Sequence, residues 1–421
     1  MKSMYKIIIC LIILLEARFL YLFNIPSFIS KYNTYHTKIL IFLLIFCGIF
    51  IMLVFKHYKY IKRKVVFNKF VILFLLLVLS EIFISYVNYS DYNQTFIDLI
   101  WVCYFYFIIC LYYIIVYLCI RFDDYSYKKV IIIFSLILSI IFIIQAYIYN
   151  SGGTLILKIP EISKVGIESR LGRIRLTYPS TLISFACVLS FSEIFNRDAK
   201  KKTLNILNLI FSLIYLIYVC QTRALIVYVI FSMIIVLIFV NRKSAKKIIL
   251  MIITLAIAVN VFINLNITKE YINSFTDSKN SISNIARSGA IDYFIDRGNE
   301  NLIFGSGFIN SSANSKTFYI SRGSYGMFST TDVGIFGYYS IFGIVGSVLY
   351  LYLILKMLTI IWTLIKSKKI DYCVEIIGIF IFFISTSLTL IVTDSQRIIL
   401  FPIILALFNN KYYLETVKEE G

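Results

Sequence analysis

Residues 330–346, TTDVGIFGYYSIFGIVG, place an aspartate, Asp332, almost directly before a long apolar segment that is rich in glycine. They end a polar stretch, residues 266–332, whereas the rest of the chain consists mainly of long apolar runs with lysines and arginines between them. An apolar run of about 17–25 residues is long enough to cross the hydrocarbon layer of a membrane. The sequence therefore predicts a set of membrane helices with one large polar loop at one face.

The composition is that of a membrane protein. Hydrophobic residues make up 60% of the 421 residues, whereas soluble proteins contain about 45–50%. We expect an all-α integral membrane protein with about twelve transmembrane helices. The predicted helices cover residues 4–23, 39–55, 70–87, 96–120, 130–149, 176–195, 204–218, 224–240, 248–265, 333–355, 374–392 and 398–408. The first one contains Glu16 and Arg18 and lacks a small-residue cleavage site, so it is expected to be retained and not to be a signal peptide.

The net charge of +19 comes largely from basic residues in the short loops between predicted helices. These residues are Lys56, Lys59, Lys62, Arg63, Lys64, Lys69, Arg121, Lys128, Lys129, Arg197, Lys200, Lys201, Lys202, Arg242, Lys243, Lys246, Lys247, Lys366, Lys368 and Lys369. With about twelve helices, these loops and both termini lie on one side, which the positive-inside rule identifies as the cytoplasm. The charge thus indicates topology and some attraction to anionic membrane lipid, and no nucleic-acid partner is expected.

The chain divides into three predicted parts. Residues 1–265 hold nine helices and an outer-face arginine segment at 150–175, residues 266–332 form the large outer-face loop, and residues 333–421 hold the last three helices and a cytoplasmic tail. Within the loop, residues 283–297 are predicted to form a short amphipathic helix that lies on the membrane surface, and Gly305 and Gly307 permit a tight turn. Because the chain has only four prolines and lacks paired glycine or proline interruptions, broken membrane helices are not expected.

Cysteine and histidine usage gives no indication of a metal site. The eight cysteines are scattered through or beside the predicted helices without a CxxC pair, and the only histidines are His36 and His57. The cysteines are therefore interpreted as small packing residues. No metal and no cofactor is expected.

Arginines on the predicted outer side are the first candidate site residues. Arg223 stands in CQTR between two helices, where it either anchors a tight turn or grips a phosphate with its planar fork of donors. Arg170, Arg173 and Arg175 lie in ESRLGRIRLTYPS, and alternate spacing would put Arg173 and Arg175 on one side of an extended segment. This cluster is either a solvated surface or a binding site for an anionic lipid headgroup. A cluster outside the membrane runs against the positive-inside trend.

The large loop adds two arginines and an aspartate. Arg287 and Arg297 are either solvated helix charges or ligands of an anion. Asp332 either caps the following helix or acts as a general base toward a hydroxyl at the membrane boundary. Five polar residues in the outer halves of the predicted helices either line a cavity or form a structural network. They are Glu16, Arg18, Glu81, Asp98 and Gln145.

The order of these motifs resembles a known family. An outer arginine segment with a proline (RIRLTYPS) precedes a polar turn with arginine (QTRALIVYV), and a long loop with NLIFGSGF then ends in TDVGIFG. This resembles the Wzy-type polysaccharide polymerases and the related O-antigen ligases. The ligases carry His, then Asn, Ser or Gln, nine residues, Gly, two residues, Gly. Here Asp332, Val333, Gly343 and Gly346 have the same spacing, and Asp332 in place of the histidine favours a polymerase.

The resemblance implies an enzyme of the bacterial cytoplasmic membrane with its site on the outer face. Such an enzyme joins oligosaccharide repeat units that are linked to undecaprenyl diphosphate, without a nucleotide sugar or a metal ion. A hydroxyl of one unit attacks the anomeric carbon of the other, and undecaprenyl diphosphate leaves. On this resemblance Arg223 and Arg287 are expected on the diphosphate, with Arg173 or Arg175 assisting, and Asp332 on the hydroxyl. A flippase and a chain-length regulator are the expected protein partners.

Three alternative functions stay open. An O-antigen ligase would move the finished glycan to another acceptor, but the histidine of its motif is missing. A flippase or other transporter predicts charges deep in many helices and short outer loops. A receptor or scaffold for envelope assembly has no direct support in the sequence.

Overall fold

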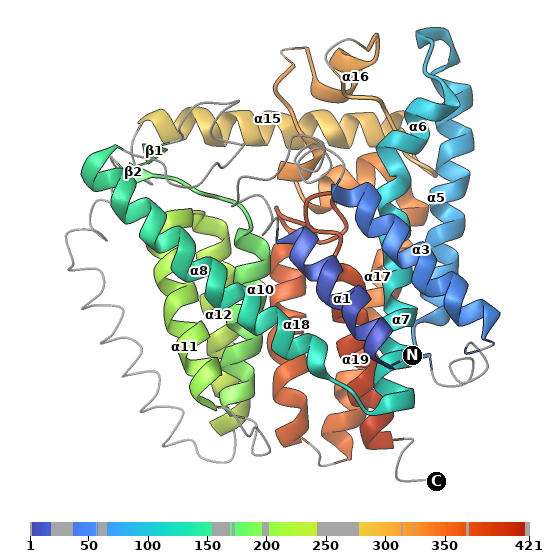
Figure 1. Ribbon diagram of the computed structural model, residues 1–421. Coiled ribbons are helices and arrows are strands. Elements are labelled where there is room, and N and C mark those ends of the chain that lie inside the picture. The colour runs from blue at the N-terminus through green and yellow to red at the C-terminus, as the bar shows by residue number, and fades with distance from the viewer. Residues whose placement is uncertain are drawn as a thin grey trace.

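The computed structural model describes residues 2–17, 37–55, 57, 65–153, 169–170, 173–195, 202–241, 278–312, 315–324, 326–367 and 370–416. Most of these residues lie in helices that form one bundle, with a single long helix lying across one end of it (Figure 1). The only strands in this part of the chain are β1 (Ser169–Arg170) and β2 (Arg173–Ile174), which pair antiparallel. Together with the apolar composition, these helices are consistent with an all-α membrane protein.

The helices and helical turns follow one another along most of the described chain. In chain order they are α1 (Lys2–Glu16), α3 (Thr37–Val54), α5 (Asn68–Asn88), η2 (Ser90–Tyr92), α6 (Phe96–Cys103), η3 (Tyr104–Cys110), α7 (Leu111–Phe122), α8 (Ser126–Gly152), α10 (Ser180–Ile194), α11 (Lys202–Ile214), η4 (Tyr215–Cys220), α12 (Arg223–Asn241), α15 (Ser278–Glu300), α16 (Phe318–Arg322), η5 (Thr330–Asp332), α17 (Ile335–Lys366), α18 (Ile370–Ser387) and α19 (Leu400–Thr416).

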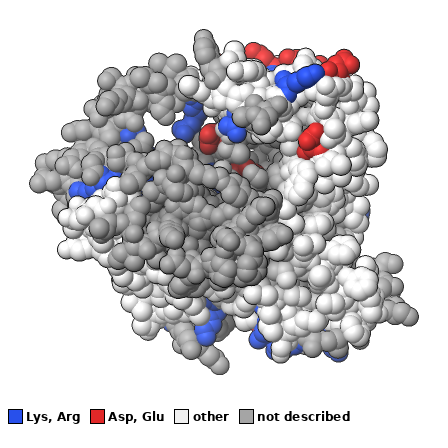
Figure 2. All heavy atoms as spheres, turned by 45° about the horizontal axis from the view of Figure 1, so that its top comes forward, with Lys and Arg blue, Asp and Glu red and all other residues white. Residues whose placement is uncertain are grey.

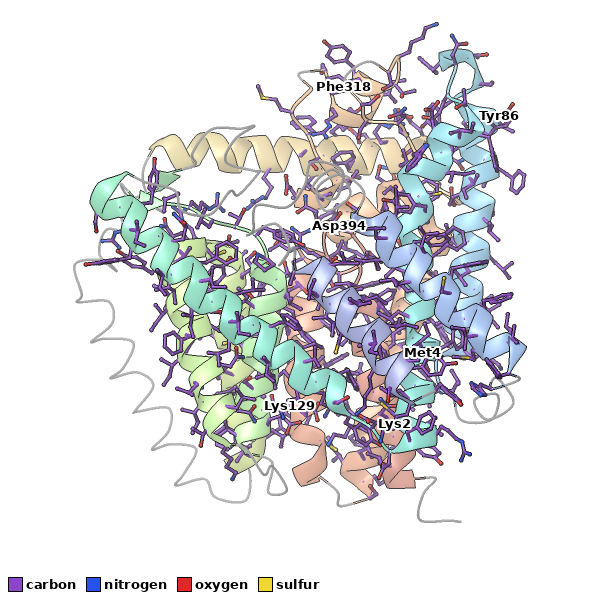
Figure 3. The ribbon with its side chains drawn as sticks, in the orientation of Figure 1. Lys2, Met4, Tyr86, Lys129, Phe318 and Asp394 are labelled. Atoms are coloured by element: carbon purple, nitrogen blue, oxygen red, sulfur yellow. The ribbon has the colours of Figure 1, made fainter. Side chains whose placement is uncertain are left out.

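Each predicted membrane helix that falls within the described residues coincides with observed helix, and the predicted helix at 248–265 lies outside them. Among the described residues, six helical segments are long and apolar enough to cross a membrane, namely 68–88, 96–122, 126–152, 202–220, 223–240 and 335–366. Three shorter apolar helices cover 39–54, 180–194 and 373–387. The total of about twelve spans and their sidedness stay predictions. Lys2 and Lys129 do lie toward the end of the bundle opposite Phe318 (Figure 3).

Helix α15 corresponds to the amphipathic helix predicted at 283–297, and it is longer at both ends. It lies across one end of the bundle, and in the view of Figure 1 the β1–β2 pair appears below its first residues and α6 and α16 beside its last residues. Ala290 and Phe294 are buried against Val333 at the base of α17. The helix therefore packs on the bundle through an apolar side, and it covers this end of the molecule.

The prediction that no membrane helix is broken is wrong for α17. Gly343 has φ 58° and ψ −153°, which interrupts the helix in its first third. A broken helix leaves carbonyls and N–H groups without their usual partners, and such groups must be satisfied when they are buried in the membrane.

Residues 302–307 supply those partners. The N–H groups of Ser306 and Gly307 donate to the carbonyls of Ser340 (2.7 Å) and Ile341 (3.0 Å), which end the first half of α17. The N–H groups of Ile344 and Val345, which begin the second half, donate to Leu302 and Ile303 at 3.0 and 3.1 Å. We call residues 302–307 the glycine loop. Its backbone groups pair with the carbonyl and N–H groups that the break in α17 would otherwise leave without partners.

The glycine loop requires glycine where its backbone passes closest to α17. A Cβ added at Gly305 would lie 2.6 Å from the backbone nitrogen of Gly343, and one added at Gly343 would lie 2.5 Å from the nitrogen of Gly305. Both residues also have positive φ values, 76° and 58°, which side chains other than glycine rarely adopt. The tight turn predicted from Gly305 and Gly307 is confirmed, and its role is to dock against a broken helix.

Candidate functional site

A cavity of about 700 Å³ opens beneath the last part of α15. Its wall combines α6 and η3, the glycine loop and the residues after it, the segment from α16 to η5, the start of α17, and the turn between α18 and α19. Acidic and basic side chains gather around a hollow in this face of the molecule (Figure 2). Of the predicted site residues, Asp332 and Arg297 line this cavity.

Asp332 presents a free carboxylate to the cavity. It is the last residue of η5, whose N-cap is Ser329, and the N-cap position of α17 is Gly334. The hypothesis that Asp332 caps α17 is therefore wrong. Its side chain is exposed and makes no hydrogen bond or ion pair with the residues that the structure describes. A carboxylate in this position is available to accept a proton from a bound hydroxyl.

The turn between α18 and α19 brings a second acidic group that sequence reasoning missed. Asp394, which is labelled in Figure 3, is 8% exposed and belongs to the cavity wall. Its Oδ2 accepts a hydrogen bond of 2.5 Å from Nη1 of Arg397, which is also 8% exposed. The same Arg397 nitrogen lies 3.4 Å from the carbonyl oxygen of Thr331, the residue before Asp332. The ion pair thus braces the turn that presents Asp332. Two charges within TDSQR, between apolar runs, were the available signal.

Arg297 has a structural partner directly after the end of α5. It donates a hydrogen bond of 2.6 Å to the hydroxyl of Tyr89, and it lies 3.9 Å from the carboxylate of Glu300. Burial raises the pKa of Tyr89, while the nearby Arg297 acts in the opposite direction. Because Tyr89 in turn donates to the carbonyl of Ser306 at 3.0 Å, Arg297 connects α15 to the glycine loop.

Two further polar residues lie on the same face of α5, and one of them bonds to the residue after the glycine loop. Ser85 lies one helical turn before Tyr89 and accepts a hydrogen bond of 2.6 Å from the backbone of Phe308. Glu81 lies one turn earlier and is fully buried. A Cβ at Gly307 would lie 3.5 Å from its carboxylate. Residues at spacings of four share one face of a helix, so Glu81, Ser85 and Tyr89 form one polar stripe behind the cavity wall.

The remaining predicted arginines lie outside the cavity wall. Arg175 donates to the carbonyl of Cys220 at 3.1 Å and to the hydroxyl of Thr222 at 3.3 Å. The Arg173 guanidinium lies 5.0 Å from the centre of the Tyr218 ring. Arg223 begins α12, directly after these partners. We call Arg173, Arg175 and Arg223 the arginine cluster.

Burial alternates through β2 as predicted, since Arg173 and Arg175 are half-buried on either side of the buried Ile174. Arg170 pairs in register with Arg173 across the two strands. Arg287 is exposed on α15. The structure therefore brings Arg297 together with Asp332, and brings Arg173 and Arg175 to the end of η4 beside Arg223, without putting these two groups in one cavity.

The other polar candidates have structural roles or lie apart from the cavity. Asp98 forms a capping box with Thr95 at the start of α6, which is the structural alternative. Glu16, Glu81 and Gln145 are buried and are not part of the cavity wall. Arg18 lies outside the described residues. Within the described part of the chain, no group of three or more His, Cys, Asp or Glu side chains is arranged to hold a metal ion.

Arg397→Ala is expected to destabilise the protein more than the double replacement of Asp394 and Arg397 by alanine. The single change leaves a buried carboxylate without its cation, which costs about 3–5 kcal/mol in a dry core. Because the pair borders a cavity, we expect a loss of about 3 kcal/mol or less. The unfolding midpoint of detergent-solubilised protein checks the order of the variants, with Arg287→Ala on the exposed face of α15 as the control. The expected order would be wrong if the double variant were less stable than Arg397→Ala.

These features define a multi-pass membrane protein with a polar cavity at one face and an acidic residue free to react. Residues 208–351 match the family model described as O-Antigen ligase. The matched stretch runs from α11 into α17 and contains Arg223, Arg287, Arg297, Asp332 and the break at Gly343. The match covers about a third of the chain, and over this stretch the chain is similar to the O-antigen ligase and polymerase superfamily. No curated protein matches the chain.

Proposed function

We propose that the protein is a polysaccharide polymerase, which joins oligosaccharide repeat units carried on undecaprenyl diphosphate. The observation that carries this proposal is the free carboxylate of Asp332 in a polar cavity, within the stretch that matches the O-antigen ligase family. Its motif has an aspartate where the ligases carry a histidine, which favours a polymerase within the superfamily.

In the proposed reaction a hydroxyl of the acceptor sugar attacks the anomeric carbon of the donor sugar. A new C–O bond forms, the bond between the anomeric carbon and the diphosphate oxygen breaks, and its electron pair leaves with undecaprenyl diphosphate. Asp332 takes the hydroxyl proton and releases it to water. General-base assistance of this kind contributes about 10²–10⁴-fold to a rate.

The leaving diphosphate requires positive charge where negative charge develops. Arg223 and Arg287 are the proposed ligands of the diphosphate, and Arg173 or Arg175 assists. The contacts of Arg173 and Arg175 around the end of η4 support this, because they hold two guanidinium groups next to the first residue of α12. Planar guanidinium groups suit the paired oxygens of a phosphate. Arg170 and Arg297 are proposed to assist substrate binding at the two ends of α15.

The reaction is proposed to take place at the outer face of a bacterial cytoplasmic membrane. The basic loops of the sequence put the opposite end of the bundle in the cytoplasm, and the cavity lies at the end covered by α15 (Figure 1). A flippase that delivers repeat units to this face and a regulator of chain length are the expected protein partners.

An O-antigen ligase is the second candidate, because the family model carries that description. It would use the same donor and the same leaving group, and only its acceptor would differ. The aspartate in place of the ligase histidine argues against it. A transporter is a weaker alternative because it predicts short outer loops, whereas residues 266–332 form one long polar stretch.

The proposal is tested in a strain that lacks the gene and carries the wild type, Arg223→Ala or Lys366→Ala on a plasmid. On a polysaccharide gel, the wild type and the control Lys366→Ala, at the predicted cytoplasmic end of α17, are expected to give a ladder. Arg223→Ala is expected to give single repeats, at equal protein levels. Full-length glycan that is made in the deletion strain but not attached to its final acceptor would instead identify a ligase. Repeats that never reach the outer face without the protein would identify a flippase.

A further inference from the structure

The cavity wall has a composition that suits a sugar. Aromatic side chains from five parts of the chain line it, and hydroxyl and amide groups stand between them. The aromatic residues include Trp101, Phe294 and Phe328, and the polar residues include Ser329, Thr393 and Gln396. Apolar walls with a few directed polar groups are typical of small-molecule sites. A sugar ring offers both C–H faces and hydroxyl edges to such a wall.

The charges of the cavity disfavour a diphosphate. Asp332 and Asp394 contribute two carboxylates, and Arg297 and Arg322 contribute the cations. Arg297 is already engaged by Tyr89 and Glu300, and the nearby Arg397 by Asp394. Because Asp394 is neutralised by Arg397, a group with two or more negative charges would meet the carboxylate of Asp332 at close range, offset in part by Arg322. A neutral polyhydroxyl ligand would instead find acceptors and donors.

The position of the cavity separates it from the arginine cluster. The cavity lies near the end of α15 that carries Arg297, beside α6 and α16, whereas β2 lies near the other end of that helix (Figure 1). None of Arg173, Arg175 and Arg223 is part of the cavity wall. Two chemically different surfaces therefore lie toward the same end of the bundle (Figure 1).

We propose that the cavity is the binding site for the acceptor sugar, and that the donor diphosphate binds on the side of the arginine cluster. This inference rests on the proposed function and assigns its two substrates to two places. Asp332 stands in the cavity wall, where it can receive the proton of an acceptor hydroxyl. Trp101 provides a ring on which the acceptor sugar stacks, and the hydroxyl groups of the wall select its orientation.

Trp101 is the residue that makes this inference measurable. It lies on α6, is 54% exposed, and borders the cavity. The chain has only two tryptophans, and the other, Trp362, lies in the last part of α17 with 68% of its surface exposed. In a Trp362→Phe variant, all tryptophan fluorescence therefore reports on the cavity.

The experiment uses full-length Trp362→Phe protein in lipid nanodiscs and two separate ligands. One is the oligosaccharide that mild acid releases from the lipid-linked repeat units of the host strain, and the other is undecaprenyl diphosphate without sugar. We expect the oligosaccharide to change the Trp101 emission in a saturable way. Undecaprenyl diphosphate and an unrelated control saccharide, isomaltotriose, are expected to leave it unchanged. A response to undecaprenyl diphosphate alone, or to neither ligand, would overturn the assignment.

A kinetic comparison separates this site from the proposed function as a whole. In polymerisation assays with extracted lipid-linked repeat units, Trp101→Ala is expected to raise KM about tenfold, as the loss of one aromatic contact of about 1.4 kcal/mol would do, with kcat within about twofold of wild type. Ile97→Ala, an exposed apolar residue of the same helix outside the cavity, should leave both constants unchanged. If the KM of Trp101→Ala is unchanged while the wild type polymerises, the acceptor-site assignment is wrong and the proposed function stands. If the protein binds the saccharide but never polymerises repeat units, the proposed function is wrong and the saccharide site stands.

Discussion

A strain whose only copy carries Asp332→Asn is expected to accumulate single repeat units and to make no polymer. Asparagine has the shape of aspartate but cannot take the proton of an attacking hydroxyl, and the loss of a general base costs about 10²–10⁴-fold in rate. The Asp332 carboxylate has no partner among the described residues, so the change should leave the amount of membrane-inserted protein unaltered. A polysaccharide gel together with an immunoblot of the membranes measures both.

Asp296→Asn is the matched control. Asp296 is an exposed residue of α15, is not part of the cavity wall, and loses the same charge. This variant should give the wild-type ladder. If Asp332→Asn also gives a wild-type ladder at a wild-type rate, Asp332 is not the base.

Gly343→Ala is expected to prevent the correct folding of α17. A methyl group at this position would lie 2.5 Å from both the Gly305 nitrogen and the Ile303 oxygen, in a backbone conformation with φ 58° and ψ −153°. That conformation alone costs a residue other than glycine about 1–3 kcal/mol, and the overlap with backbone atoms adds about 1–3 kcal/mol more. We expect aggregated protein on size-exclusion chromatography in detergent, or an unfolding midpoint far below that of the wild type.

Gly289→Ala and Gly152→Ala serve as controls for this prediction. A Cβ at Gly289 would meet only the Phe328 ring at 3.6 Å, and one at Gly152 would meet nothing within 4 Å. Both variants should elute as the wild type does. A Gly343→Ala protein that is monodisperse, with the midpoint of these controls, would show that the glycine loop does not need its close approach to α17.

Hydropathy predicted the helices well because each of them is an apolar run with charged ends, which is a local property of the chain. It could not predict the break at Gly343, since this glycine lies inside an unbroken apolar run from Ile335 onward. The break is stable only because residues 302–307, about forty positions earlier, supply the missing hydrogen bonds. A contact of that kind leaves no periodic signal in the sequence.

In the candidate site, too, the residue with a local signal was predicted from the sequence, whereas the residues whose role depends on long-range packing were not. Asp332 could be found because it stands alone at the end of a polar loop, and the structure places it in a cavity wall. Asp394 and Arg397 were missed because their importance depends on the packing of the α18–α19 turn against η5. The sequence does not distinguish Arg223 and Arg287 from Arg297, since all three are arginines of the predicted outer face. Of the three, only Arg297 lines the cavity.

The repair of α17 by the glycine loop has a consequence for anyone who would graft this region onto a related protein. Residues 302–307 and the first third of α17 complete one another's hydrogen bonds and share a glycine contact that no other residue fits. A hybrid that takes the helix from one parent and the preceding segment from another would have to match both partners of that contact. A hybrid should therefore take both segments from the same parent.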